Sequence, residues 1–278
     1  MKHNLDRIFF AVHCEPWAIL PERHRAIVSA LDKHLAGTGK ASALDMMETD
    51  GEDEAKPFDI VGSVGVIAIE GTILNKCSGL ETLCGAFSLQ TFKANLKELA
   101  ANPLVKSIVL NISSGGGSVG GVPEAADVIA AVADKMPVYA YTDDVCASAA
   151  YWLASQAGGV FLSKSAIMGS IGVYSAIVDE SKAWEKAGLK LELFKAGKFK
   201  ADGIEGGTLS DDAKEQRQAR VDKIYGDFTA AILSKRPNVS ADTMQGQVFC
   251  GKEAVACGLA DGVIDDLDAL IAYLNSGK

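Results

Sequence analysis

The sequence predicts a protein of the α/β class, in which strands alternate with helices that cover a sheet. Between residues 61 and 236, short apolar runs alternate with segments whose apolar residues recur at helical spacing. The chain of 278 residues is long enough to bury a substantial core. Its content of 48% hydrophobic and 23% charged residues is ordinary for a soluble globular protein.

The order of these elements favours parallel strand pairing through right-handed crossovers. Strands are expected at residues 64–69, 105–112, 138–141, 160–162, 171–178 and 189–194. Helices are expected at residues 88–101, 123–133, 179–187 and 210–236, with a further one beginning at residue 148. The first of these helices carries Leu89, Phe92 and Leu96 on one face and is followed by Pro103.

Two further zones precede the alternating region. Residues 1–44 are expected to form a small helical appendage. Within it, Ile27, Leu31 and Leu35 recur at helical spacing, which predicts a helix that begins at Pro21.

An acidic segment separates this appendage from the alternating region. Five carboxylates lie between Glu48 and Glu54, a pattern typical of a solvated and flexible linker. We therefore expect a linker at residues 45–60 and one α/β domain at residues 61–278.

Composition and charge argue against several classes of function. A net charge of −9 and a pI near 5.0 disfavour a general nucleic-acid binder, because phosphate contacts need clustered Lys and Arg. The apolar run Ile8–Val12 is too short for a secretory signal, and no stretch approaches the roughly 20 apolar residues that cross a bilayer. The six cysteines lack Cys-x-x-Cys spacing, which predicts reduced thiols in a cytoplasmic protein and no metal site.

The position of the histidines limits the possible chemistry of the best nucleophile candidate, Ser148. All four histidines lie within the first 34 residues, more than a hundred residues before this serine. A serine hydroxyl needs a base to take its proton, and lysine is the next side chain able to serve. A lysine of ordinary pKa is neutral in only about one molecule in 2500 at pH 7, so the base would have to be desolvated.

A glycine-rich segment, Asn111–Gly121, comes at the end of one predicted strand and precedes a helix. Glycines let the backbone approach a ligand closely and present N–H groups to it. These donors suit a phosphate or a developing oxyanion, but no Gly-Lys-Ser/Thr follows as in a P-loop. The segment alone is equally compatible with a simple turn.

Three further segments carry residues of interest. Ser148 lies where a helix should begin, so that the Ala149 N–H would be free to complete an oxyanion hole; the alternative is that Ser148 only caps the helix. The hydroxyl of Ser170 could orient a lysine amine, or Ser170 could belong to a tight turn. Residue chemistry does not choose among the candidate bases Lys195, Lys198 and Lys200.

The order of these segments resembles the signal peptide peptidase A family of serine proteases, which includes relatives in phage head assembly. The family pattern Ser-Pro-Gly-Gly-x-Val corresponds to Ser114–Val119, with Gly115 in place of the proline. The family pattern Ala-Ser-Gly-Gly-Tyr-Tyr corresponds to Ala147–Trp152, which replaces both glycines by alanine and keeps the aromatic pair.

The remaining two family patterns are Gly-Ser-Ile-Gly-Val and Ser-Gly-x-x-Lys-Asp. The first matches Gly169–Val173 without change, and the second corresponds to Ala196–Asp202. This correspondence selects Lys200 over its two neighbours. The resemblance covers about residues 61–270.

The resemblance implies a repeated β-β-α superhelix of the ClpP and crotonase type and a Ser/Lys dyad without cofactor or metal. Ser148 would attack a peptide carbonyl, Lys200 would accept the proton, and Ser170 would orient the lysine. The expected oxyanion donors are the backbone N–H groups of Gly116, Gly117 and Ala149.

The resemblance also implies partners and a setting. An extended peptide substrate would pair with an exposed strand edge beside the glycine loop. The chain is expected to form a homo-oligomeric ring or dome, in which serine and lysine can come from neighbouring subunits. We expect no nucleic acid, no membrane anchor, and a cytoplasmic location, in the bacterial host if the chain is phage-encoded.

The leading hypothesis is a serine endopeptidase that processes scaffold or other peptides in phage or prophage head assembly. A signal-peptide-degrading peptidase of the host type is the nearest alternative. A crotonase-type acyl-CoA enzyme would need an acid/base carboxylate near the oxyanion hole and would not use Ser148 with Lys200. A non-catalytic assembly protein would have no need for either residue.

Overall fold

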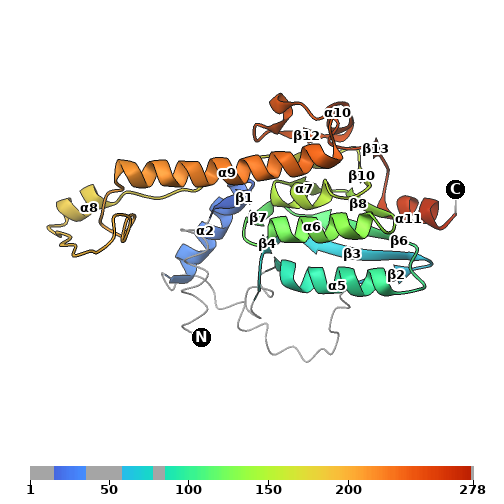
Figure 1. Cartoon of the computed structure of the whole chain (residues 1–278), viewed down its shortest axis with the longest axis horizontal. Coiled ribbons are helices and arrows are strands. Elements are labelled where there is room, and N and C mark those ends of the chain that lie inside the picture. The colour runs from blue at the N-terminus through green and yellow to red at the C-terminus, as the bar shows by residue number, and fades with distance from the viewer. Residues whose placement is uncertain (1–15, 36–57, 78–84, 277–278) are drawn as a thin grey trace.

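A six-stranded sheet forms the centre of the protein (Figure 1). The computed structural model describes residues 16–35, 58–77 and 85–276. The strand order is β13-β10-β8-β6-β3-β2, and all neighbouring pairs are parallel except β2 with β3. The strands are β2 (Asp59–Val61), β3 (Val64–Glu70), β6 (Ser107–Ser113), β8 (Val138–Thr142), β10 (Gly159–Leu162) and β13 (Gly262–Val263). The predicted α/β class with parallel pairing is confirmed.

Helices cover both faces of this sheet. Alternate residues of β6 face opposite ways, so Ile108 and Leu110 join the larger core while Val109 packs with Leu270 and Ile271. The helices of the larger core include α5 (Leu89–Ala101), α6 (Val122–Ala133) and α7 (Ala149–Ala154), and α11 (Leu267–Asn275) covers the other face.

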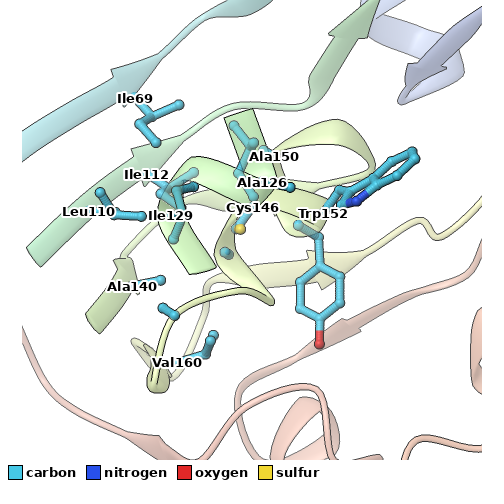
Figure 2. Close-up of a cluster of buried hydrophobic side chains, with 14 of the residues drawn as sticks. Ile69, Leu110, Ile112, Ala126, Ile129, Ala140, Cys146, Ala150, Trp152 and Val160 are labelled. Carbon is cyan, nitrogen blue, oxygen red and sulfur yellow. The ribbon is translucent and has the colours of Figure 1, made fainter. Parts of the chain in front are cut away.

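The larger core is densely apolar around α6 and α7. Figure 2 shows Ile112 of the sheet near Ile129 of α6 with Cys146 close by, and Trp152 farther along the same core. Burial raises the pKa of the Cys146 thiol, which therefore behaves as a small hydrophobic side chain. Burying such side chains contributes roughly 1.5–3 kcal/mol each for the larger ones, enough to fix the position of α7.

Two smaller sheets extend this core. Two strands of the large sheet continue into a short strand that leaves it and then into a helix, in β6-β7-α6 and β8-β9-α7, and β3 does so with two short strands, in β3-β4-β5-α5. This arrangement is the predicted repeated β-β-α unit. One small sheet has the order β1-β7-β4-β5 and the other β12-β11-β9. Their strands are β1 (Trp17–Ile19), β4 (Thr72–Leu74), β5 (Ala86–Ser88), β7 (Gly116–Ser118), β9 (Val145–Ala147), β11 (Ile167–Gly169) and β12 (Val248–Cys250).

The N-terminal appendage contains more than a helix. The predicted helix is present as α2 (Pro21–Leu35), but the residues before it form strand β1, which pairs with β7 of the domain. The four apolar residues between Pro16 and Pro21 are the signal that could have predicted this strand. Residues 36–57, which include most of the predicted linker, lie outside the described residues, and β2 begins at Asp59.

The segment between β11 and the long helix differs from the prediction. Neither 171–178 nor 189–194 forms a strand; the first makes one isolated bridge at Tyr174 and the second has no strand partner in the described part of the chain. The predicted helix 179–187 is reduced to α8 (Ser181–Lys186). A strand needs a hydrogen-bonding neighbour, and an alternating apolar pattern alone does not supply one.

The long helix α9 (Asp211–Lys235) matches its predicted position, and the Ser210 side chain accepts the Ala213 N–H at its start. Smaller helices complete the C-terminal part: η2 (Ala241–Met244) and α10 (Gly251–Ala256). The Phe228 ring stacks on Trp152 of α7, with centroids 4.4 Å apart. This contact fixes the second half of α9 to the domain, while its first half extends past the domain towards α8 (Figure 1).

An ion pair anchors the end of α9. The Arg236 side chain is 8% exposed, and its Nη2 lies 2.6 Å from a carboxylate oxygen of Asp261. The same carboxylate accepts the Val160 N–H at 2.7 Å. Burial alone would raise the pKa of Asp261, but these hydrogen bonds and the Arg236 charge hold it below its usual value.

We predict that Asp261→Asn lowers stability by about 1–2 kcal/mol at pH 7, because it leaves the buried guanidinium without its charge partner; the partial exposure of Asp261 limits the loss. The contribution is present above the ordinary carboxyl pKa and is lost as pH falls through the lowered pKa. Denaturant unfolding at pH 7 and at pH 3 measures both effects.

Asp265→Asn is the matched control, because the Asp265 side chain is 79% exposed and its pair with Lys164 is at the surface. Its stability should stay within about 0.5 kcal/mol of the wild type. Equal losses in the two variants would contradict the assigned role of Arg236 and Asp261.

Candidate active site

Ser148 lies at a sharp turn between strand β9 and helix α7. Its backbone has φ 56° and ψ −119°, a left-handed conformation that is uncommon for a residue with a side chain. The side chain makes no capping hydrogen bond, so the alternative of a simple helix cap is wrong. A strained serine at a strand-to-helix turn is the arrangement that presents a nucleophile in other hydrolases.

Main-chain hydrogen bonds hold this turn. The Ser148 N–H donates to the Gly169 carbonyl at 2.7 Å, and the Ser148 carbonyl accepts the Trp152 N–H at 2.9 Å. The Ala149 N–H is in the first turn of α7 and has no acceptor within the helix. The Ser148 residue is 1% exposed, with its Oγ 3.5 Å from the Gly172 carbonyl oxygen.

The glycine-rich loop is fastened to the strand that precedes Ser148. The Ser114 N–H donates to the Val145 carbonyl at 2.8 Å, and the Ala147 N–H donates to the Ser114 carbonyl at 3.0 Å. The Ser114 hydroxyl donates to the Gly71 carbonyl at 2.6 Å and accepts the Gly116 N–H at 3.2 Å. The predicted proximity of the loop and Ser148 is therefore present, and Ser114 is a positioning residue that the sequence reasoning missed.

Gly116 is the point of contact between this loop and the serine turn. It has φ 100°, and a β-carbon there would lie 3.1 Å from the Ala149 nitrogen and collide with the Ala18 carbonyl. A β-carbon on Gly117 would collide with the Ile73 carbonyl. The expected oxyanion donors Gly116 and Ala149 are thus neighbours, although the Gly116 N–H is engaged by Ser114 here.

Ser170 lies beside the serine turn, directly after the glycine that binds the Ser148 N–H. Its own N–H donates to the Gln247 carbonyl at 2.6 Å, and its backbone is also left-handed, with φ 50°. The residue borders an open cavity of about 370 Å³. Other residues that line this cavity include Ile19, Gly172, Tyr174 and, from α9, Asp222 and Tyr225.

Lys200 is not part of this cluster. It is exposed, and it lies in the segment between α8 and α9. That segment is at the end of α9 remote from α7 (Figure 1). Because α9 meets Trp152 at Phe228, 17 residues after Asp211, about 25 Å of helix lies between this contact and the start of α9. A single chain therefore does not bring the predicted nucleophile and base together.

The neighbouring lysines have other partners. Lys195 pairs with Asp202 at 3.3 Å, and Lys198 pairs with Asp212 at 2.7 Å. Within the described residues, Lys200 has no carboxylate in ion-pair distance. Of the three candidates it is the one whose amine is not already committed to an acid.

The expected exposed strand edge beside the glycine loop is covered. Strand β1 pairs antiparallel with β7, so that Ala18 lies opposite Gly117 and Ile19 opposite Gly116. The expectation of an open edge is therefore wrong for this structure. Strand β1 occupies this edge, and we expected only a helix in the appendage.

We predict that Gly116→Ala destabilises the chain by about 1–3 kcal/mol, since an alanine would combine a left-handed backbone with a collision against Ala18. Gly120→Ala is the control, because its β-carbon would meet only the Ser118 hydroxyl at 3.8 Å. Denaturant unfolding compares the two, and equal stability would refute the tight contact.

Two curated phage proteins show sequence similarity along most of the chain. Capsid assembly protease C of Escherichia phage lambda is 32% identical over 226 residues, which cover 80% of this chain and 51% of that protein. Head-tail preconnector protein GP5 of Enterobacteria phage P21 is 26% identical, over 97% of this chain and 57% of its own length. The chain thus spans little more than half of these relatives.

Similar solved structures include a mutant of ClpP1 from Listeria monocytogenes, with 17% identity, 74% and 94% coverage and a TM-score of 0.44. An enoyl-CoA hydratase/isomerase from Marinobacter aquaeolei has 10% identity, 79% and 74% coverage and a TM-score of 0.46. No helix within the described ranges is long and apolar enough to cross a membrane. The sequence model of Peptidase family S49 matches residues 130–277, more than half of the sequence, and the chain belongs to this family.

Proposed function

We propose that this chain is a serine endopeptidase that uses Ser148 as its nucleophile. The observation that carries the proposal is the strained turn that places Ser148 beside the Ala149 N–H, which has no acceptor within helix α7, and beside the glycine loop at Gly116. Serine, a helix N-terminal N–H and a glycine loop together suit attack on a carbonyl and stabilisation of the resulting oxyanion. Membership of Peptidase family S49 agrees with this chemistry.

In the proposed mechanism the Ser148 Oγ attacks the peptide carbonyl as neutral Lys200 takes its proton. N–H groups of Ala149 and of Gly116 or Gly117 hold the oxyanion, each contributing about 3–4 kcal/mol to the barrier reduction. The protonated lysine then gives its proton to the leaving amine, and water hydrolyses the acyl-enzyme. Ser170 is assigned the orientation of the lysine amine.

We assign Lys200 of a neighbouring copy to each Ser148. An exposed lysine is cationic at neutral pH, so it must be covered by protein before it can act as a base. The segment that carries Lys200 is rich in exposed apolar side chains, and Phe194 is 95% exposed. Such a patch favours contact with another subunit. The exposed apolar residues of this segment are Leu189, Leu193, Phe194, Phe199 and Ile204.

For the biological role we propose the processing of scaffold or other proteins in phage or prophage head assembly. The names Capsid assembly protease C and Head-tail preconnector protein GP5 support this role for the two phage relatives. Putative signal peptide peptidase SppA of Enterococcus faecium, 26% identical over 66% of this chain, supports the host-type alternative. Capture of uncut substrate proteins by an inactive Ser148→Ala chain in phage-producing cells distinguishes the two roles: scaffold proteins support the head-assembly role, and signal peptides support the host-type role.

We predict that Ser148→Ala and Lys200→Ala each lose peptidase activity, by about 10⁴-fold or more for the serine. The inactive chains should recover part of the activity when unfolded together and reassembled, because some sites then combine an intact serine with an intact lysine. Peptide hydrolysis measures both results. Lys198→Ala is the control and should stay active, since Lys198 is paired with Asp212. No recovery in the mixture would exclude a site shared between chains.

We also predict that replacing all four histidines by glutamine leaves peptide hydrolysis within about threefold of the wild type, because no imidazole takes part in the proton transfer. His24 packs its ring against Trp17 and Tyr174, so circular dichroism must first show that the variant is folded. A folded variant without activity would refute the lysine base.

A further inference from the structure

Strand β1 is held by main-chain hydrogen bonds from both sides. Towards β7, the Leu20 N–H donates to the Gly115 carbonyl at 2.9 Å, and the Val119 N–H donates to the Pro16 carbonyl at 3.2 Å. Towards the other side, Trp17 and Tyr174 exchange two N–H···O bonds, at 2.9 and 3.0 Å. An extended segment that is hydrogen-bonded through its main chain to neighbouring backbone resembles a peptide ligand bound by strand addition.

The strand runs beside the backbone groups of Gly116 and Ala149. The space where a β-carbon of Gly116 would lie is filled by the Ala18 carbonyl oxygen and borders the Ala149 nitrogen. The next residue, Ile19, lines the same cavity as Ser170. The Ala18 carbonyl is therefore placed beside the groups assigned to the oxyanion hole.

The side chains of the strand fill opposite sides of the groove. Trp17 and Ile19 pack in one apolar cluster with Tyr174, while Leu20 packs against Ala147, the residue before Ser148. Ala18 is completely buried, which leaves no room for a larger side chain at this position. The groove thus fits an extended apolar peptide with a small residue at its centre.

The glycine loop is adapted to this strand at Gly115, where the family pattern has proline. Its φ is not in the left-handed region, so backbone conformation does not require a glycine. A β-carbon there would instead lie 2.9 Å from Arg23 Cγ and 3.5 Å from Leu20 Cδ1. The side chains that a β-carbon at this position would meet thus belong to the N-terminal segment.

We propose that residues 16–20 occupy the peptide-binding groove as an internal inhibitor, and that substrates displace them. The inference rests on the proposed function, because it takes the groove beside Ser148 to be the substrate site. The substrates that compete best are extended apolar peptides with alanine or glycine in the place of Ala18.

A disulfide between positions 17 and 174 tests the inhibition in the full chain. Mutually hydrogen-bonded antiparallel residues have Cα atoms about 5.5 Å apart, which suits a disulfide. In Trp17→Cys/Tyr174→Cys, the oxidised form should have at least about tenfold lower kcat/KM for a peptide than the reduced form. Trp17→Cys alone, treated in the same way, is the control. Equal activity of a fully bridged and a reduced sample would overturn the proposal.

A binding measurement separates this inference from the proposed catalysis. In a Ser148→Ala background, Leu20→Pro removes the N–H that bonds Gly115 and loosens the internal strand. A fluorescent peptide with the sequence of residues 14–22 should then bind about tenfold more tightly, because more of the groove is free. Ile60→Pro in edge strand β2 is the control and should leave Kd unchanged.

The outcomes are distinguishable. An unchanged Kd with Leu20→Pro would overturn the internal inhibitor, whatever the enzymatic activity. Suppose that Leu20→Pro tightens peptide binding but the wild-type chain hydrolyses no peptide. This result would support the internal inhibitor and contradict the proposed peptidase activity.

Discussion

The left-handed turn at Ser148 is the constraint around which the rest of the site is arranged. A residue with a side chain adopts this conformation only when its surroundings impose it. Here the Gly169 carbonyl holds the Ser148 N–H, and the buried helix α7 fixes the following residues. The hydrogen bonds of Ser114 to β9 then bring the glycine loop against the same turn. The Gly169 carbonyl, helix α7 and the glycine loop that surround Ser148 come from successive strands of the fold and the segments that follow them.

The same fold leaves the proposed base outside the site of its own chain. Lys200 belongs to a segment with exposed apolar side chains, while Ser148 is buried and strand β1 pairs with the neighbouring glycine loop. Both features are explained if activity requires a second copy of the chain and an empty groove. The isolated chain would then be inactive for two independent reasons, which suits a protease made before its substrate is assembled.

The sequence predicted those parts of the fold that depend on local pattern. Strands β3, β6, β8 and β10 and helices α5, α6 and α9 lie within a few residues of their expected positions because burial on a sheet imposes periodicity, whereas the short strands β2, β4, β5, β7 and β9 were not predicted. The proximity of the glycine loop, Ser148 and Ser170 was also predictable. Strand β1 and the unformed strand at 189–194 were not, because pairing depends on which neighbour is available in space. The left-handed turn of Ser148 has no sequence signal without its tertiary contacts.

The most direct test of the central claim is mass-spectrometric mapping of the adduct formed by a fluorophosphonate, which reacts with activated serines, on the assembled protein. The account predicts modification of Ser148, no modification of Ser170, and no adduct at all in a chain with Lys200→Ala. An adduct on another residue, or undiminished labelling of Ser148 without Lys200, would contradict it.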